Sequence, residues 1–176
     1  AHIENLSRFG VPVDVAVNRF ASDTDAEVER VKARAADMGA PCGVHEFHGK
    51  GSEGSLEVAE MADDLARPAK KPQTPLYPLD MPLRQKIETI ATKVYGAGAA
   101  AFEAAAARNL ERLEALGYGA LPVCIAKTQA SLSDNPTLLG RPRGFTMNIK
   151  DAYVSAGAGV VVAISGNIMQ MPGLGK

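Results

Sequence analysis

The first 47 residues alternate between short apolar runs and one long amphipathic run, and this alternation constrains the fold more than any other feature. The Val-rich residues 11–20 and the apolar residues 41–47 each suit a strand buried on both faces. The segment between them has Thr24 and Glu27 at the spacing of a helical capping box and ends at Gly39, a typical helix stop. A strand, a helix and a strand in this order predict a right-handed βαβ crossover with parallel strands.

The rest of the chain continues this alternation of helices and strands. Apolar spacing predicts the following further elements: helices over 55–66, 84–95 and 101–117, and strands over 121–127, 145–154 and 160–165. In the third of these helices, Phe102 is expected on the apolar face. The predicted fold class is therefore α/β, with a mostly parallel sheet and flanking helices.

Proline divides the chain. Five of the eleven prolines fall within residues 67–82, where they remove backbone donors and fix φ, so this segment is expected to be a connector. We predict a βαβα unit over residues 1–66 and an α/β subdomain over residues 83–176 that is incomplete at its C-terminus. The chain lacks an initiator Met and stops in loop-like sequence, which indicates a piece of a longer protein.

The composition is that of a globular chain, with 46% hydrophobic and 22% charged residues. A net charge of -1 gives no field that would attract a polyanion, so nucleic acid is not an expected partner. No apolar run approaches the roughly 20 residues of a membrane span, and no signal peptide is evident, so a cytoplasmic location is expected. Cys42 and Cys124 lie in apolar runs and are expected to be buried, reduced thiols.

Residues 49–54 spell G-x-G-x-x-G, the pattern of a dinucleotide-binding turn. That fingerprint also requires a following strand that ends in an acidic residue about 20 positions on, and here the proline-rich segment occupies that place. The dinucleotide interpretation is therefore disfavoured. The glycines still allow a backbone to approach a ligand closely, and whether this loop binds one stays open.

Cys42, His45 and His48 resemble a metal array, but no fourth convergent ligand accompanies them. If all three lay on one strand, His45 would point away from the other two, because strand side chains alternate between faces. We therefore predict no metal site.

Two loops that follow predicted strands contain residues of interest. Asn18 resembles the base-reading Asn of an N-K-x-D loop, but the expected Lys and Asp are out of register, so a strand end followed by a helix cap is favoured. Phe20 is an aromatic residue in a polar loop at the carboxyl end of a parallel strand, where open α/β sheets bind ligands. Lys127, Arg141 and Arg143 flank or lie in the polar loop 128–144, where they either hold a carboxylate or phosphate or are solvated surface charges.

Three long stretches resemble the formate–tetrahydrofolate ligase family. They are ENLSRFGVPVDVAVNRFASDTDAE (4–27), LPVCIAKTQASLSDNPTLLGRPRGFT (121–146) and SAGAGVVVAISGNIMQMPGL (155–174). The resemblance covers essentially the whole chain. It implies an internal piece of the C-terminal half of a homotetrameric enzyme, comprising a P-loop NTPase-like portion and a smaller C-terminal α/β subdomain, with the P-loop itself far upstream.

The resemblance also implies an activity for the whole protein. ATP phosphorylates formate to formyl phosphate, and the N10 amine of tetrahydrofolate then attacks the formyl carbon to give 10-formyltetrahydrofolate. Magnesium and ATP phosphates would be held mainly by the upstream part, so no catalytic residue is expected in this chain, and the piece alone should be inactive.

The family's motifs assign binding roles to particular positions. In the family, the Phe of an N-R-F motif and a Trp 28 positions later sandwich the folate, and this spacing connects Phe20 to His48, with Val44 on the neighbouring strand. Residues Ser155, Ala156, Gly157, Ala158 and Gly159 are expected near the adenine of the nucleotide.

The chain departs from the family pattern at several of these positions. His48 stands where the family has Trp, and Gly49 stands where Ala is usual, so the stacking area for folate is smaller. Ala130 replaces a usual Tyr. Two alternatives accordingly stay open: a GTPase-like or other P-loop nucleotide-binding domain, and a catalytically dead relative that serves as a binding module.

Overall fold

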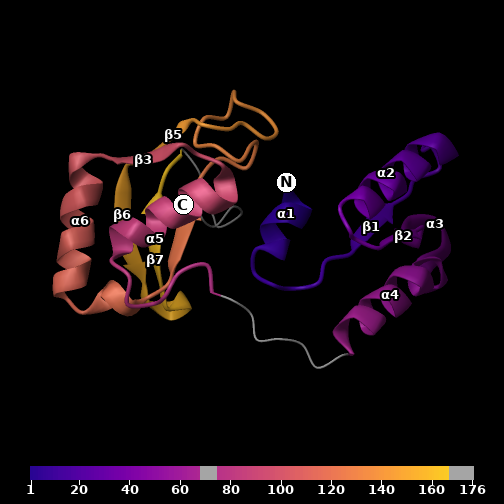
Figure 1. The fold of residues 1–176 in the computed structure, drawn as a ribbon, viewed down its shortest axis with the longest axis horizontal. Helices are drawn as coiled ribbons and strands as arrows, with labels where there is room; N and C mark the ends of the chain where they lie inside the picture. Colours follow the sequence, from indigo (N-terminus) through magenta and orange to yellow (C-terminus); the bar gives the residue numbers. More distant parts are fainter. Residues whose placement is uncertain (68–74, 167–176) are drawn as a thin grey trace, which may run out of the picture. The chain divides into compact units, whose positions relative to one another are not determined.

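The chain divides between Pro75 and Leu76 into two compact units (Figure 1). The computed structural model describes residues 1–67 and 75–166. The division falls inside the proline-rich segment 67–82. Each unit has its own parallel strand pairing.

The first unit is built around two short strands and the helices that follow them. Its elements in chain order are α1 (His2–Ser7), β1 (Val15–Asn18), α2 (Asp25–Asp37), β2 (Cys42–His45), α3 (Phe47–Lys50), the 3-10 turn η1 (Gly51–Ser55) and α4 (Leu56–Ala66). Helix α1 was not expected from the sequence, and β1 covers only part of the predicted strand 11–20.

The predicted βαβ crossover is confirmed. Strands β1 and β2 pair in parallel, and α2 connects them. The Thr24 hydroxyl accepts a hydrogen bond from the Glu27 backbone N–H at 3.3 Å, and the Glu27 carboxylate accepts one from the Thr24 N–H at 2.9 Å. Helix α2 then ends just before Gly39, whose φ of +71° suits glycine.

Helix α4 packs closely on β2 at Gly43. A Cβ placed on this buried glycine would lie 3.1 Å from Val58 and 3.2 Å from Met61, both on α4. The absence of a side chain at Gly43 therefore allows the helix to approach the strand that carries His45.

The second unit contains a longer series of elements. They are α5 (Leu83–Ile90), the π-helical turn η2 (Ala91–Tyr95), β3 (Ala99–Phe102), α6 (Ala104–Ala115), η3 (Tyr118–Ala120), β4 (Val123–Ala126), β5 (Thr146–Ile149), β6 (Asp151–Ser155), η4 (Ala156–Ala158) and β7 (Val160–Ile164). Strand β3 pairs in parallel with β5 and β4 with β7, whereas β6 pairs antiparallel with β7. The α/β class predicted from the sequence is confirmed.

The core of the second unit lies between its strands and its helices. Figure 1 shows α5 crossing the strands and α6 running beside β6. The buried apolar residues of this core are Leu83, Ile87, Ile90, Ala91, Ala97, Ala106, Leu110, Ile125, Met147, Ile149, Ala152, Val161 and Ala163.

Two sequence predictions for this unit were wrong in detail. Phe102 was expected on a helix, but it ends strand β3, and helix α6 begins only at Ala104. The strand predicted over 145–154 divides at Lys150 into β5 and β6, because its first half pairs with β3 and its second half with β7. The Lys150 N–H still donates to the Ile164 carbonyl at 2.7 Å, so the backbone remains bonded through the switch of partner.

The prediction of two buried thiols was also wrong for Cys124. This residue is exposed on β4, whereas its neighbour Ile125 is buried, because successive side chains of a strand face opposite sides. Cys42 is half-buried on β2, and burial raises the pKa of its thiol. Both cysteines are free. In the described ranges, no helix combines the length and the apolar character needed to cross a membrane.

A buried ammonium group anchors α5 in the second unit. Lys86 is fully buried, and its Nζ donates to the carbonyls of Leu79 and Gly119 at 2.6 Å and of Leu121 at 2.9 Å. Burial lowers the pKa of Lys86, and the Glu114 and Asp80 carboxylates oppose this shift. The three bonds join α5 to the segments before α5 and before β4.

We predict that Lys86→Met destabilises the second unit. The substitution keeps the length of the side chain but leaves three carbonyls without their donor, which should cost about 2–4 kcal/mol. The measurement is the urea-unfolding midpoint of the full-length protein, with hydrogen exchange of the α5 amides as a local signal. Lys93→Met, at an exposed lysine of the adjoining turn, is the matched control. Equal effects of the two substitutions would contradict the anchoring role.

Candidate functional site

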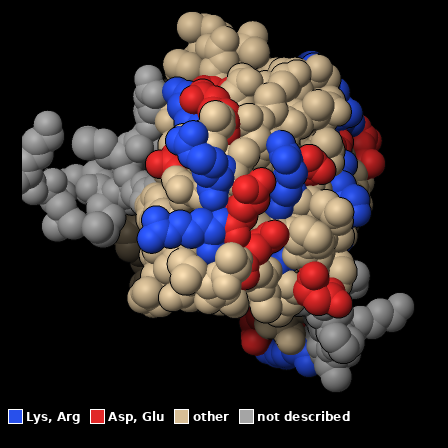
Figure 2. Space-filling model, turned by 90° about the vertical axis from the view of Figure 1, so that its left-hand side faces the viewer, with Lys and Arg blue, Asp and Glu red and all other residues tan. Residues whose placement is uncertain are grey.

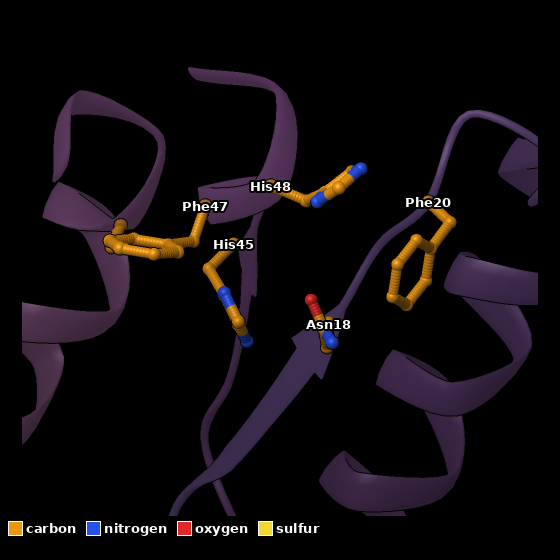
Figure 3. Close-up of a pocket in the computed structure, with 6 residues that line it drawn as sticks. Asn18, Phe20, His45, Phe47 and His48 are labelled. Carbon is orange, nitrogen blue, oxygen red and sulfur yellow. The ribbon is translucent and has the colours of Figure 1, made fainter. Parts of the chain in front are cut away.

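A pocket lies where the two parallel strands of the first unit end. In the β1–β2 ladder, Asn18 is opposite His45, and these are the last residues of their strands. The pocket has a volume of about 520 Å³ and is lined by Asn18, Phe20, His45, Phe47, His48 and Ser55 (Figure 3). It therefore occupies the carboxyl edge of a parallel pair, the place where open α/β sheets bind ligands.

The loop after β1 holds Phe20 in place through its backbone. The Phe20 N–H donates to the Asp23 carboxylate at 2.8 Å, and the Asp23 N–H donates to the Phe20 carbonyl at 3.0 Å. The Arg19 guanidinium donates to the Asp25 carboxylate at 2.6 Å, and the Arg19 N–H donates to the His45 carbonyl at 3.0 Å. These bonds leave the Phe20 ring 47% exposed on a closed turn beside the pocket.

The glycine-rich stretch shapes the opposite side. The Glu46 N–H donates to the Gly54 carbonyl at 2.8 Å, and a Cβ on Gly54 would lie 2.8 Å from the Glu46 carbonyl oxygen. Gly51 has a φ of +61°. The glycines therefore let the chain fold back against the start of α3, the helix that carries His48. This geometry gives a structural reason for two of the three glycines of the G-x-G-x-x-G pattern, Gly51 and Gly54.

The rings of Phe20 and His48 face each other across the pocket. Their centroids are 5.9 Å apart and their planes are inclined by 45°. In Figure 3 the His48 ring points from α3 toward Phe20, whereas the Phe47 ring points the other way. A flat molecule between two parallel rings needs about 7 Å, twice a contact of about 3.5 Å. The observed separation of 5.9 Å is shorter than this, so a ligand stacked between the rings would require the two side chains to rotate apart.

The expected orientation of His45 away from His48 is not observed. It required both residues to lie on one strand, but β2 ends at His45 and His48 lies on the separate helix α3. Strand alternation therefore does not apply, and both imidazoles line the pocket. The register that pairs Asn18 with His45 brings both residues to this edge, because residues that end adjacent parallel strands lie side by side. Asn18, dismissed as a strand end, lines the pocket as well.

Val44 does not lie beside these residues at the pocket surface. It is half-buried within β2, opposite Val17 in the ladder, and is not among the six residues that line the pocket. The structure therefore brings together Phe20 and His48 but leaves Val44 in the strand behind them.

The segment expected near a nucleotide belongs to the second unit. Ser155 ends β6, residues Ala156–Ala158 form the turn η4, and Gly159 has a φ of +65° before β7. The segment is thus the connection of an antiparallel hairpin. A role in nucleotide binding stays a prediction for these residues.

The three candidate anion-binding residues differ in their surroundings. The Lys127 ammonium donates to the Thr128 carbonyl at 3.0 Å and to the Ser131 carbonyl, and it lies 5.2 Å from the centre of the Tyr95 ring. Burial lowers the pKa of Lys127. Arg141 and Arg143, later in the same loop, are exposed. Lys127 is therefore bonded within its own loop, whereas the arginines are exposed, and a role in anion binding stays a prediction for all three residues.

Charged side chains and potential metal ligands occur throughout the part of the chain that the structure describes. On the face in Figure 2, basic and acidic side chains are interspersed, without a broad patch of one sign. Across residues 1–67 and 75–166, no group of three or more His, Cys, Asp or Glu side chains could hold a metal ion.

The fold and the site define an α/β protein with an aromatic-lined pocket at the carboxyl edge of a parallel strand pair. The chain matches the formate–tetrahydrofolate ligase family over residues 1–176 and belongs to that family. It is 47% identical over 173 residues to a formate–tetrahydrofolate ligase of Maricaulis maris (strain MCS10). The match covers 98% of this chain and 31% of that protein, so the chain spans about a third of its relative's length. The match does not favour a GTPase-like domain.

We predict that Gly54→Ala disturbs the pocket, because its Cβ would collide with the Glu46 carbonyl. Such overpacking should cost about 1–3 kcal/mol and reduce the hydrogen-exchange protection of the Glu46 amide. Gly49→Ala is the control, since a Cβ at Gly49 would have no heavy atom within 4 Å. If both variants kept wild-type protection at Glu46, the proposed close approach would be refuted.

Proposed function

We propose that this chain forms the tetrahydrofolate-binding part of an ATP-dependent formate–tetrahydrofolate ligase. The single observation that carries the proposal is the Phe20–His48 ring pair, 5.9 Å apart at the carboxyl edge of β1 and β2. Two aromatic rings on opposed loops suit a flat heteroaromatic ligand, and membership of the family supports the pterin of tetrahydrofolate as that ligand.

The reaction of the complete protein proceeds in two transfers. Formate attacks the γ-phosphorus of ATP, which gives formyl phosphate and ADP. The N10 amine of tetrahydrofolate then attacks the formyl carbon, phosphate leaves with the bonding electrons, and the amine loses a proton. Phosphorylation thus converts a poor leaving group into a good one.

The chain's own part in this reaction is to bind and orient the folate. Stacking on Phe20 and His48 would hold the pterin plane and thereby fix the direction in which the attached N10 amine points. Because the described residues contain no cluster of three or more His, Cys, Asp or Glu side chains that could bind a metal, we assign magnesium no place among them. ATP phosphates and magnesium would be bound by other parts of the complete protein, and a homotetrameric assembly stays a prediction.

We predict that Phe20→Ala weakens tetrahydrofolate binding by the full-length protein. The loss should be roughly 5- to 100-fold, the effect of removing one aromatic stacking surface. Isothermal titration measures it, and Leu56→Ala is the control, because Leu56 is 58% exposed in the same unit but does not line the pocket. An unchanged affinity in Phe20→Ala would refute the stacking assignment.

We also predict that His48→Trp tightens tetrahydrofolate binding, by about 3- to 10-fold, because indole offers more stacking area than imidazole. Formate-dependent ATP turnover by the same proteins separates a working ligase from a binding module. A protein that binds tetrahydrofolate but shows no such turnover would be the catalytically dead relative. Weaker binding in His48→Trp would show that the ring at this position does not stack on the ligand.

A further inference from the structure

Two polar side chains form the floor beneath the Phe20–His48 ring pair. Asn18 ends β1 and His45 ends β2, and the two are partners in the parallel ladder. Figure 3 shows the Asn18 carboxamide near the opening between His48 and Phe20, with the His45 ring beside it. A flat ligand held between the rings would present its edge, not its face, to these two groups.

The side chains of the two floor residues are not bonded within the described part of the chain, although their backbones belong to the β1–β2 pair. Among the residues that the structure describes, the Asn18 carboxamide and the His45 imidazole take part in no hydrogen bond or ion pair. Arg19, between Asn18 and Phe20 in sequence, contrasts with them, because its guanidinium is bonded to Asp25. Asn18 is also exposed, so its donor and acceptor are both accessible from the pocket.

The chemistry of a carboxamide fits one part of the proposed ligand. A carboxamide presents an N–H donor and a carbonyl acceptor side by side, which is how Asn and Gln recognise a donor–acceptor edge of adenine. The pterin ring carries such an edge at N3–H and its 4-oxo group. The side chain is thus complementary to a cyclic amide, and one imidazole nitrogen can add a further hydrogen bond.

We propose that Asn18, with His45 beside it, recognises the N3–H and 4-oxo edge of the pterin. This inference rests on the proposed function, because it takes tetrahydrofolate as the ligand of the pocket. Stacking on Phe20 and His48 would then accept any flat molecule. The hydrogen bonds of the floor residues would distinguish the pterin from other flat molecules. Asn18 is in this sense a specificity-determining residue.

The test compares two ring probes in the full-length protein. The probes are 6-methyltetrahydropterin and its 4-deoxy analogue, which lacks the oxygen that Asn18 would bond, and isothermal titration gives both affinities. Asn18→Leu keeps a similar side-chain size without hydrogen-bonding groups. We expect it to weaken binding of the complete pterin by roughly 5- to 20-fold and to leave the 4-deoxy analogue nearly unaffected, because an unpaired buried polar group is costly.

Phe20→Ala serves as the matched comparison, since it should weaken both probes by the same factor. His45→Leu should reduce binding of the complete pterin by a smaller factor than Asn18→Leu.

An unchanged ratio of the two affinities in Asn18→Leu, with Phe20→Ala still weakening both, would overturn the edge recognition and leave the proposed function standing. A wild-type protein that binds neither tetrahydrofolate nor the pterin would overturn the proposed function itself. Circular dichroism of each variant checks that a loss of binding is not a loss of fold.

Discussion

The parallel pairing of β1 with β2 determines which side chains can meet in this pocket. Because the two strands run in the same direction and end together at Asn18 and His45, the loops that follow them begin at the same edge of the sheet. Residues Phe20 and His48, 28 positions apart in sequence, become neighbours for this reason. A shift of the register by one residue would turn each strand's side chains to the other face and separate the ring pair from its floor.

The polar residues around the pocket divide into two groups by what they bond. In the loop that carries Phe20, the Asp23 carboxylate accepts a hydrogen bond from a backbone N–H, and the Asp25 carboxylate accepts one from a guanidinium. The side chains of Asn18 and His45, by contrast, have no hydrogen bond or ion pair to any residue in the described part of the chain. Hydrogen bonds within the protein thus fix the loops, while the carboxamide of Asn18 and the imidazole of His45 have no partner among the described residues.

Local patterns predicted the part of the structure that local interactions determine. The capping box of Thr24 and Glu27 follows from spacing alone, since both hydrogen bonds join residues three apart. The division of residues 145–154 at Lys150 does not follow from spacing, because it depends on which strand pairs with each half of the segment. Strand β3 was missed because its Ala-rich sequence, 99–102, is compatible with a helix, and only pairing with β5 makes it a strand.

Site residues were predictable to a similar extent. The spacing of Phe20 and His48 could be matched to a family motif, but the floor residues could not. The place of His45 at the pocket depends on where β2 ends, and the structure was needed to show that β2 ends at His45. The hydrogen bonds of Lys127 and the burial of Lys86 likewise could not be predicted from the sequence. Each lysine donates hydrogen bonds to backbone carbonyls of its own unit. The sequence alone does not indicate which lysines have such partners.

The exchange of the family's Trp for His48 affects the pocket through both area and movement. The backbone on each side is held, at Phe20 by the Asp23 carboxylate and at α3 by the Glu46–Gly54 hydrogen bond. Widening the gap from 5.9 Å toward the roughly 7 Å that a stacked ligand needs must therefore come from rotation of the two exposed side chains. Such rotations are inexpensive for exposed rings, and the smaller imidazole turns with less obstruction than an indole. Under the proposed function, the smaller stacking area at position 48 would be partly offset by easier opening, and recognition of the ligand's edge by the floor would supply a larger share of the binding free energy.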